Sequence, residues 1–591
     1  MKNIFVYFQN QLALFSDNIS DYMINFPMWF YYCLASILII LFIIPGQFNL
    51  PPLDRDEARF AQASKQMIED NDYVKIQFQE KLRAKKPIGI YWIQSFSASL
   101  FGKNKISSYR IPNIFAAFLT CILTGFFVYT ILTKIIGQSY QISVNVGILS
   151  SIFLSSLFGF AIEIRQAKTD TFLLLICLIQ QWLLWKVYYF ANSDWNNSKN
   201  FETPWIVYFF WFFVALGILI KGPISPLLAF LTVLSMVILD RISLNKWNLN
   251  WLAFLSIIRG LIIILIVNLP WVLLAWNATD GKLILNALND DLLQKIISGQ
   301  ENHGAPPGTH FIFLFFTFWP LSLLIPLAGR ASIDWKHQQI IRFLLSWIIP
   351  FWLVMEIVPT KLPHYILPVF PALIALIMIG FSSPPSGLKL FSILRNFYKS
   401  IVVIVSFLFI FVSFFIILKF STNLYLLIWV PILGIMVLFS VFMGLSFSVK
   451  SSRNKLSPLY FMTIFAGLFN IFLIGSVIPN LDKIHISPKI YSEILKIEPY
   501  PEVIVSAGYS EPSLIFFLGK DTFLVNSQEA GIILIENPEA LAIVEKRSFK
   551  EFNKTISNLN KKIEEISVIS GYNLAKGENV SIGLYKLEKI K

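Results

Sequence analysis

The sequence predicts a polytopic α-helical membrane protein with a small α/β domain at its C-terminal end. Of its 591 residues, 56% are hydrophobic, and the mean hydropathy is +0.65. Only 14% of the residues are charged, whereas soluble globular proteins carry roughly 25%. The apolar residues form runs of about twenty, the length with which a helix crosses a bilayer. After Pro479 these runs stop and short β-type segments begin.

About thirteen apolar runs qualify as membrane spans. Met1 to Pro27 lacks a signal-peptide pattern, so we expect a cytoplasmic segment 1–27 and a first span that stays as an anchor. The membrane part extends over 28–480 and the C-terminal domain over 481–591. The approximate spans are 28–46, 111–134, 142–162, 171–190, 205–220, 223–240, 252–276, 311–329, 339–358, 363–381, 399–418, 423–447 and 458–478.

The charges of the short loops predict the orientation. With a cytoplasmic N-terminus, the even-numbered loops carry many cations and few acids, in agreement with the positive-inside rule. The long loop 47–110 and the domain 481–591 then lie on the opposite face. Nucleotides are cytoplasmic reagents, so chemistry on that face needs a donor that crosses the membrane by another route. The cations of the even-numbered, cytoplasmic loops are Lys134, Lys199, Arg241, Lys246, Arg330, Lys336, Arg342, Lys389, Arg395, Lys399, Lys450, Arg453 and Lys455.

The loop 47–110 should contain two amphipathic helices that lie on the membrane. The first covers 56–70, where apolar residues recur at helical spacing and two acids occupy the positive first turn. The second covers 88–101 and begins behind Pro87, a residue favoured at helix starts. Tyr91 and Trp92 suit the membrane interface.

The C-terminal domain shows six strand-like segments and one helix, which predicts a small α/β fold without a nucleotide-binding motif. The helix is expected at Ser548–Lys562. The strands are expected at Val503–Ala507, Thr522–Val525, Gly531–Ile535, Ala540–Val544, Ile566–Ile569 and Val580–Lys586.

The acids Asp56 and Glu57 are the first candidate site. Acids beside a membrane are costly unless they are solvated, paired or used. A carboxylate there can act as a general base toward a hydroxyl acceptor, or stabilise an oxocarbenium-like sugar. Asp54 competes for the same role. In a purely structural interpretation, the acids only complement the helix dipole.

The same loop carries cations that can bind a phosphate. Arg59, Arg83, Lys85 and Lys86 together offer planar forks and point charges, and Pro87 restricts Lys86. The structural alternative is a solvated basic loop attracted to lipid head groups.

Further polar clusters lie between spans on the same face. Arg165 and Asp170 can pair within a cavity, or belong to an ordinary polar turn. Lys221, before Gly222-Pro223, can contact phosphate, or extend to the interface. Lys361, His364 and Tyr365 form another cluster, and the loop around His303 can cover a cavity.

The composition also excludes some classes. The net charge of +13 is spread over short loops, so anionic lipid is expected as a partner and nucleic acid is not. Cys33, Cys121 and Cys177 lie in apolar spans without metal-ligand spacing, so we expect neither disulfides nor a cysteine metal site.

The motif Asp56-Glu57-Ala58-Arg59-Phe60-Ala61, followed by Lys86-Pro87-Ile88-Gly89-Ile90-Tyr91-Trp92, resembles the membrane glycosyltransferases of the GT-C superfamily. Within the protein mannosyltransferase-like (RgtA/B/C/D-like) set, it is most similar to the bacterial lipid A 4-amino-4-deoxy-L-arabinose transferase group. The resemblance covers roughly 28–480. Supporting segments are Lys221-Gly222-Pro223, Trp319-Pro320 and Lys361-Leu362-Pro363-His364-Tyr365.

The resemblance implies a GT-C fold and the transfer of a sugar, with inversion, from a polyprenyl-phosphate carrier. The acceptor would be a lipid A-type glycolipid or another envelope glycan at the outer face of the bacterial inner membrane. Asp56, with Glu57, would be catalytic. Substrate and phosphate would be bound by Arg59, Arg83, Lys86, Arg165, Asp170, Lys221, His303, Lys361, His364 and Tyr365.

One position departs from the aminoarabinose transferase pattern. Members of that group tend to have a Glu, associated with metal binding, immediately before the Lys of the second motif. Here Lys85 occupies that position. The resemblance therefore leaves a divalent metal open, while Lys85 argues against it and against aminoarabinose as the sugar; no other cofactor is expected.

Three alternatives remain at this stage. A protein O-mannosyltransferase would use the same donor chemistry with a protein hydroxyl as acceptor. A transporter or flippase of an anionic lipid would hold its key charges near the middle of the membrane. A non-catalytic envelope scaffold would act through the C-terminal domain.

Overall fold

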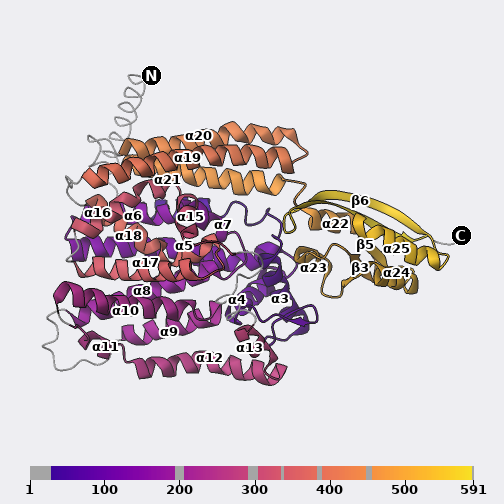
Figure 1. Cartoon of the computed structure of the whole chain (residues 1–591), viewed down its shortest axis with the longest axis horizontal. Helices are drawn as coiled ribbons and strands as arrows, with labels where there is room; N and C mark the ends of the chain where they lie inside the picture. The colour runs from indigo at the N-terminus through magenta and orange to yellow at the C-terminus, as the bar shows by residue number, and fades with distance from the viewer. Residues whose placement is uncertain are drawn as a thin grey trace.

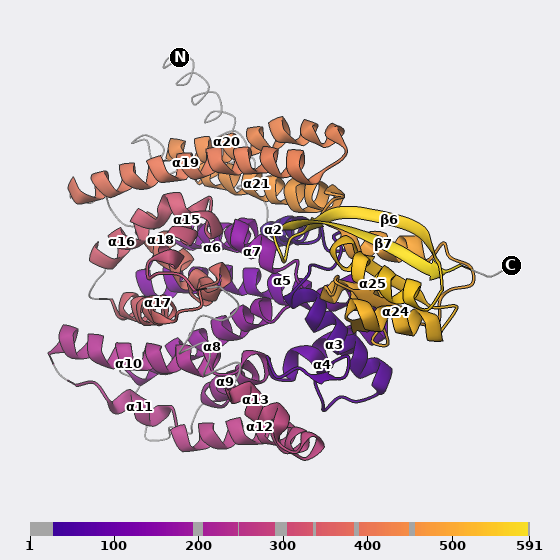
Figure 2. The ribbon, with the colours of Figure 1, turned by 45° about the vertical axis from the view of Figure 1, so that its right-hand side comes forward.

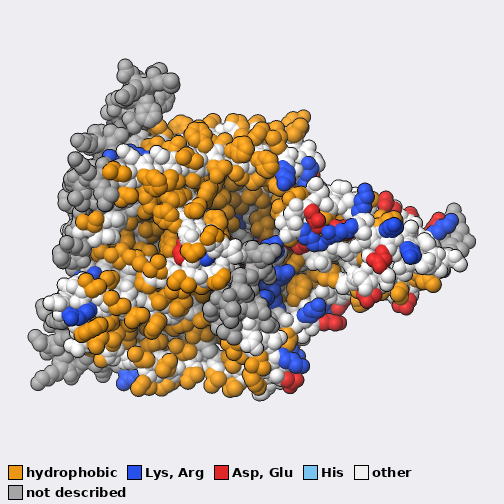
Figure 3. Space-filling model, in the orientation of Figure 1, with side chains coloured by type: hydrophobic (Ala, Val, Ile, Leu, Met, Phe, Trp, Pro, Cys, Tyr) orange, Lys and Arg blue, Asp and Glu red, His pale blue; other side chains and the backbone are white. Residues whose placement is uncertain are grey.

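Long apolar helices lie side by side and form most of the molecule, and the C-terminal domain lies beyond one of their ends (Figure 1). The computed structural model describes residues 28–192, 205–245, 247–289, 304–334, 338–382, 389–447 and 456–588. The predicted cytoplasmic segment 1–27 lies outside the described residues. Apolar side chains cover the helical part, and Lys and Arg gather where it meets the C-terminal domain (Figure 3).

Within the described ranges, nine helical segments are long and apolar enough to cross a membrane, or ten if the bent pair Thr309–Thr317 and Leu321–Ile333 counts as one. Two further apolar helices, Trp29–Ile43 and Trp205–Lys221, are shorter. The protein is thus a multi-pass membrane protein, as predicted. Helix length and composition do not confirm the number of thirteen spans.

The helices of the membrane part differ in how deeply they are buried. In the most apolar stretch of Pro363–Phe381, 83% of the residues are buried inside the protein, whereas in that of Asn250–Thr279 only 17% are buried and most lie at the protein surface. The elements are α2 (Met28–Ile43), α5 (Ile106–Ile131), η1 (Leu132–Ile136), α6 (Tyr140–Ser156), α7 (Phe158–Glu163), α8 (Asp170–Ala191), α9 (Trp205–Lys221), α10 (Ile224–Leu244), α11 (Asn250–Phe254), α12 (Ile257–Thr279), α13 (Lys282–Asn286), α15 (Thr309–Thr317), η5 (Leu321–Leu324), α16 (Ile325–Asp334), α17 (Gln339–Ile357), η6 (Pro363–Val369), α18 (Phe370–Ser382), α19 (Lys389–Phe420), η7 (Leu424–Ile428), α20 (Trp429–Phe447), α21 (Ser457–Phe472), η8 (Leu473–Val477) and η9 (Ile478–Asn480).

The first loop contains the two predicted helices, α3 (Asp56–Asp70) and α4 (Gly89–Phe101), and a small hairpin of β1 (Gln77–Phe78) and β2 (Lys81–Leu82). Protein covers α3 on two sides, which its amphipathic pattern did not indicate, and its position at the membrane surface stays a prediction. The helix packs against α4 on one side and against the C-terminal domain on the other (Figure 2). Most of its side chains are buried, including polar ones, because a second protein layer covers its outer face.

The C-terminal domain is a five-stranded mixed sheet with the strand order β4-β3-β5-β7-β6. Strand β3 runs parallel to β4 and β5, and the β6–β7 hairpin adds antiparallel strands. Buried apolar side chains on both faces hold helices against the sheet. The elements are α22 (Ile486–Ile494), β3 (Ile504–Ala507), α23 (Pro512–Leu518), β4 (Phe523–Val525), α24 (Ser527–Glu536), β5 (Leu541–Glu545), α25 (Lys546–Asn558), β6 (Ile563–Asn573) and β7 (Glu578–Leu587).

One predicted strand, Gly531–Ile535, is wrong because this segment belongs to helix α24. The side chain of Asn526 accepts a hydrogen bond from the backbone N–H of Glu529 and thereby caps the helix. Such a cap is a typical helix start. Ala530 and Leu534, four residues apart, pack on the sheet, so the apolar run fits the helical period as well as a strand.

The C-terminal domain is attached to the first loop by several polar contacts. The Arg55 guanidinium donates to the Ala575 carbonyl at 2.7 Å, and the Lys65 ammonium donates to the Phe516 carbonyl at 2.9 Å. The Gln79 amide donates to the Thr522 carbonyl at 2.7 Å. The domain therefore holds the loop that carries the candidate catalytic acids.

Candidate functional site

Charged side chains from five separate segments converge where the membrane helices meet the C-terminal domain. Asp56 comes from the first turn of α3, and Lys86 precedes α4. Lys168 lies between α7 and α8, Lys221 ends α9, and His364 begins η6. Ion pairs through Glu163 and Asp170 join Lys168, Lys221 and His364, and the charges of Lys168, Lys86 and His364 act on Asp56.

The two neighbouring acids of α3 point in different directions. Arg55, which precedes the helix, has a φ of 70°, in a region that L-residues rarely adopt. Its side chain is fixed on the C-terminal domain, as described above. Glu57 is buried at 1% exposure, whereas Asp56 is exposed.

Both carboxylate oxygens of Glu57 are used in a buried ion pair with Arg110. The Arg110 Nε lies 2.7 Å from Glu57 Oε1, and Nη2 lies 2.8 Å from Oε2. The backbone N–H groups of Leu53 and Ala167 also donate to this carboxylate, at 2.8 and 2.9 Å. The geometry therefore argues against the catalytic role predicted for Glu57: its carboxylate joins three chain segments.

Asp56 makes no direct hydrogen bond or ion pair to any described residue. Although its side chain is exposed to the site, the surrounding protein desolvates it, which alone would raise its pKa; the positive charges of Lys168, Arg83 and Lys86 outweigh this effect and lower the pKa below the usual Asp value. Asp56 is thus an ionised acceptor that faces the site without a fixed partner in the part of the chain that the structure describes. Such a group is available to a substrate hydroxyl.

Beside Asp56 lies a buried network of acids and bases. Lys221 Nζ pairs with Asp170 Oδ1, and Lys168 Nζ lies 2.9 Å from Glu163 Oε2. The His364 ring bridges the two pairs, with Nδ1 3.4 Å from Glu163 Oε1 and Nε2 3.6 Å from Asp170 Oδ1. The network fixes three cationic or titratable groups in place.

Lys168 keeps its charge in this network. Burial alone would lower its pKa, but the acids Glu163, Asp170 and Asp56 raise the pKa well above the usual Lys value. Arg165 and Asp170 of the same segment were predicted site residues, whereas Glu163 and Lys168 were not. Nothing in their local spacing reveals that they meet His364, which lies about two hundred residues away in the chain.

The expected pair between Arg165 and Asp170 is wrong. Arg165 is 1% exposed, and its guanidinium donates to the backbone carbonyls of Phe42, Pro45 and Ala161, each at 2.6 Å. These carbonyls are at the end of α2 and in α7. Arg165 therefore connects helix ends through its hydrogen bonds and does not pair with Asp170.

The other predicted phosphate contacts occupy different parts of the region. Arg83 stacks its guanidinium 5.1 Å from the centre of the Phe60 ring, and its charge acts on Asp56. The positive charge of Arg59 favours the ionised form of Asp54, which opposes the rise in its pKa that burial causes. The Lys221 ammonium lies 5.6 Å from the centre of the Tyr365 ring.

Lys361 belongs to a neighbouring cluster that braces the loop before α15. Its ammonium donates to the Val358 carbonyl at 2.7 Å. Glu356 accepts hydrogen bonds from the backbone of Gly308 and Phe311, and His310 Nδ1 lies 3.6 Å from Glu356 Oε2. Sequence analysis missed Glu356 and His310. His303, which it proposed, lies outside the described residues.

Gly89 of the second motif has a packing role. A Cβ atom there would lie 2.7 Å from the Leu219 carbonyl oxygen, which is closer than real Cβ atoms approach. Only glycine lets α4 pack this closely against the last turn of α9. This contact brings the segment of Lys86 beside Lys221.

The residues present do not fit a metal centre. Lys85 stands where the resembling group has a Glu. Among the described residues, no three His, Cys, Asp or Glu side chains converge closely enough to hold a metal ion. His364 directs its two ring nitrogens to opposite acids.

An apolar cavity of about 330 Å³ adjoins the network. Glu163 and His364 form its polar corner, and the remaining walls are apolar except for Thr317. The other lining residues are Phe158, Gly159, Ile162, Phe313, Phe316, Pro363 and Leu367. A cavity of this kind suits a hydrocarbon chain that ends in a polar group.

Asp54 gives the contact with the C-terminal domain a pH dependence. Burial, assisted by Glu511, raises its pKa to about 6, although the Ser513 N–H and Arg59 favour the ionised form. Because the native pKa exceeds the unfolded one, the folded state binds the extra proton between about pH 4 and pH 6. Stability therefore falls as the pH rises through this window.

We expect Asp54→Asn to raise the thermal unfolding temperature at pH 7.5 and to leave it unchanged near pH 4. Asparagine keeps an acceptor for the Ser513 N–H, 3.0 Å away, and avoids burying a charge. Thermal unfolding of both proteins at the two pH values measures this. A lower unfolding temperature of the variant at pH 7.5 would show that the hydrogen bond to the carboxylate outweighs its burial.

The fold and the motifs match known proteins, although no family model matches the chain. The undecaprenyl phosphate-α-4-amino-4-deoxy-L-arabinose arabinosyl transferase of Shewanella sediminis is 23% identical over 357 residues, which cover 59% of this chain and 60% of that relative. The chain thus matches about 60% of the relative's length. The predicted resemblance to this group is confirmed.

A crystal structure has the same fold over nearly the whole chain. ArnT from Cupriavidus metallidurans, in the apo state, superimposes with a TM-score of 0.70 at 14% identity and covers 94% of this chain and 97% of its own. Its structure bound to undecaprenyl phosphate gives a TM-score of 0.67 at 14% identity, with the same coverage. The predicted fold class is thereby confirmed.

Proposed function

We propose that this protein transfers a sugar from a polyprenyl-phosphate carrier to a lipid A-type glycolipid or another envelope glycan. The transfer takes place at the outer face of the bacterial inner membrane. The observation that carries this proposal is the Asp56 carboxylate, which pairs with no described residue and is kept ionised by the positive charges of Lys168, Arg83 and Lys86. An acceptor base and a set of cations for a leaving phosphate are the two parts that such a transfer requires.

The cations stabilise the phosphate that leaves. As the bond from the anomeric carbon to the phosphate oxygen breaks, negative charge grows on the carrier phosphate. The positive charges of Lys86 and Arg83 act on Asp56, and Lys168 stays protonated. Fixed positive groups in a partly buried site stabilise developing charge without reorganising.

Asp56 acts on the acceptor. If the acceptor is a sugar or protein hydroxyl, the carboxylate accepts its proton while the oxygen attacks the anomeric carbon. The pair of electrons from the broken bond stays on the carrier phosphate. If the acceptor is a lipid phosphate, it is already ionised and needs no base, and the Asp56 carboxylate stabilises the positive charge that develops on the sugar.

The apolar cavity supports a lipid donor. Its polar corner at His364 and Glu163 opens toward the charged network, while its other walls are apolar. A carrier chain can occupy it with the phosphate near the cations. The ArnT structure with the same fold binds undecaprenyl phosphate, which agrees with a carrier of this chemistry here.

Comparison of envelope lipids and glycans by mass spectrometry tests the proposal. Cells that lack the gene should lose one sugar from one envelope component, and the wild-type gene should restore it. A sugar missing from proteins instead would identify the protein O-mannosyltransferase activity. Unchanged glycans, together with a changed distribution of anionic lipid between the leaflets, would contradict the proposal and indicate a transporter.

We expect Lys86→Ala to lower kcat/KM for sugar transfer by about 10²-fold, because removal of one fixed donor to a developing anion costs about 10²–10³ in rate. Lys81→Ala is the matched control, because Lys81 is an exposed lysine of the same loop and should stay within about twofold of the wild type. Initial rates with purified protein and a polyprenyl-phosphate sugar measure both. Equal losses in the two variants would contradict a specific phosphate contact by Lys86.

A further inference from the structure

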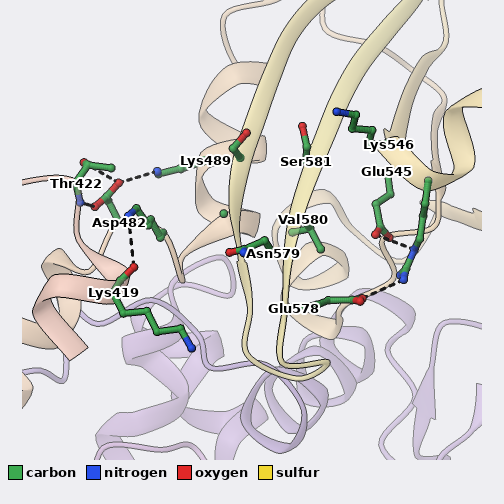
Figure 4. A pocket seen from close by; sticks show the side chains of 14 residues that line it. Lys419, Thr422, Asp482, Lys489, Glu545, Lys546, Glu578, Asn579, Val580 and Ser581 are labelled. Atoms are coloured by element: carbon green, nitrogen blue, oxygen red, sulfur yellow. Dashed lines mark hydrogen bonds and ion pairs between the residues drawn. The ribbon is translucent and has the colours of Figure 1, made fainter. Parts of the chain in front are cut away.

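A second cavity lies between the membrane part and the C-terminal domain, on elements that the proposed reaction does not use. Its volume is about 720 Å³. Asp482 and Lys489 lie on one side of it and Glu545 and Lys546 on the other, with the β6–β7 hairpin between them (Figure 4).

Positive charge dominates this cavity. Five basic and three acidic side chains line it. Each of the acids is already paired: Asp482 lies 3.3 Å from the Lys489 ammonium, and Arg547 lies 2.8 Å from Glu545 and 3.0 Å from Glu578.

The remaining three cations, Lys419, Lys483 and Lys546, have no acidic partner among the described residues. The Lys483 ammonium donates to the Lys419 carbonyl at 3.4 Å, and the Lys419 ammonium lies 4.6 Å from the centre of the Tyr572 ring. These contacts direct the side chains without neutralising their charge, so an anion that enters the cavity meets uncompensated ammonium groups.

The backbone adds further donors on the far side. Lys546 and Arg547 are the first residues of the thirteen-residue helix α25, and no side chain caps its N-terminus. The first N–H groups of a helix carry partial positive charge and bind anions. This helix end thus reinforces the lysines of the same cavity.

The position of the cavity favours a lipid over a soluble ion. Lys419 stands one residue before the end of α19, which contains the candidate span Ile393–Phe420. The β6–β7 hairpin is fixed on this span end, since the Tyr572 N–H donates to the Lys483 carbonyl at 2.7 Å and the Lys483 N–H to the Phe420 carbonyl at 3.0 Å. Beside it, Tyr425 is 89% exposed, as expected for an aromatic side chain at a membrane interface.

We propose that this cavity binds the phosphate group of a membrane lipid whose chains remain alongside α19 and α20. The phosphate contacts Lys419, Lys483 and Lys546, and the lipid connects the C-terminal domain to the bilayer surface. None of these three lysines takes part in the proposed sugar transfer. The phosphate can belong to an anionic phospholipid or to a phosphorylated glycolipid, because both present the same group at the same depth.

Lipid binding to the full-length protein in a neutral detergent tests the proposal. The probes are phosphatidylglycerol, bis-phosphorylated lipid A and dephosphorylated lipid A, and native mass spectrometry measures the bound fraction. The test variant is Lys483→Ala combined with Lys546→Ala. Lys561→Ala combined with Lys562→Ala removes two exposed lysines of the same domain and is the matched control.

We expect the test variant to bind phosphorylated lipid about tenfold to thirtyfold more weakly, since each basic residue near a membrane surface contributes about 1 kcal/mol. Weaker binding of both phosphatidylglycerol and bis-phosphorylated lipid A supports a phospholipid occupant. Weaker binding of bis-phosphorylated lipid A alone supports the glycolipid. The combined Lys→Arg variant should retain binding. Equal binding by the test and control variants, or equal loss for dephosphorylated lipid A, would overturn the proposal.

Discussion

Asp56→Asn should lower the rate of sugar transfer by about 10²–10⁴-fold, the range that a positioned general base contributes. The substitution keeps the shape of the side chain and removes the charge that accepts the proton. Asp56 has no fixed partner among the described residues, so the fold loses no direct contact. Single-turnover rates with purified protein, together with thermal unfolding, measure both effects.

The control for Asp56→Asn is binding of the carrier without its sugar. Polyprenyl phosphate should bind the variant at least as tightly as the wild type, because removal of a negative charge from the site favours an anion. A variant that keeps the full rate of transfer would contradict the role of Asp56. A variant that binds the carrier much more weakly would instead assign Asp56 to binding.

Glu57→Gln should destabilise the protein by about 3–5 kcal/mol, because removal of one partner from a buried ion pair leaves the other charge unpaired. Arg110 would stay buried with its remaining bonds to the carbonyls of Gln47, Leu50 and Pro51. The first loop is then no longer tied to the segment before α8. Thermal unfolding should show a large decrease for Glu57→Gln and almost none for Asp56→Asn.

This contrast separates the two neighbouring acids. The structural role of Glu57 predicts that Arg110→Gln lowers the unfolding temperature to a similar extent, because it breaks the same pair from the other side. If Glu57→Gln instead unfolds at the wild-type temperature and loses only activity, then Glu57 is a catalytic group and the interpretation of the buried pair fails.

The membrane part was predictable because spans are specified by length and apolar composition alone. Short-range signals also located α3 and α4, and they placed Asp56 and Lys86 in one loop. The apolar segment Gly531–Ile535 was not resolved in this way, because its composition fits a strand and only the cap at Asn526 favours a helix.

The interior of the site depends on long-range contacts, which no local pattern encodes. Arg110 and Glu57 are separated by 53 residues, and each alone resembles an ordinary interfacial charge. Arg165 appeared to be a partner for Asp170 because they are near in sequence, but helix packing directs it to backbone carbonyls instead. The position of α3 between α4 and α23 likewise follows from the docking of a distant domain.

The central claim is that the site of Asp56 and Lys86 faces away from the cytoplasm, because only a lipid-borne sugar is available on the non-cytoplasmic face. Spheroplasts carrying Lys81→Cys or Ser243→Cys, with the three native cysteines replaced, can be labelled with a membrane-impermeant maleimide. Both positions are exposed, and Ser243 lies at the opposite end of α10 from the site. Labelling of position 81 alone is the predicted result; labelling of position 243 alone would place the site in the cytosol and contradict the account.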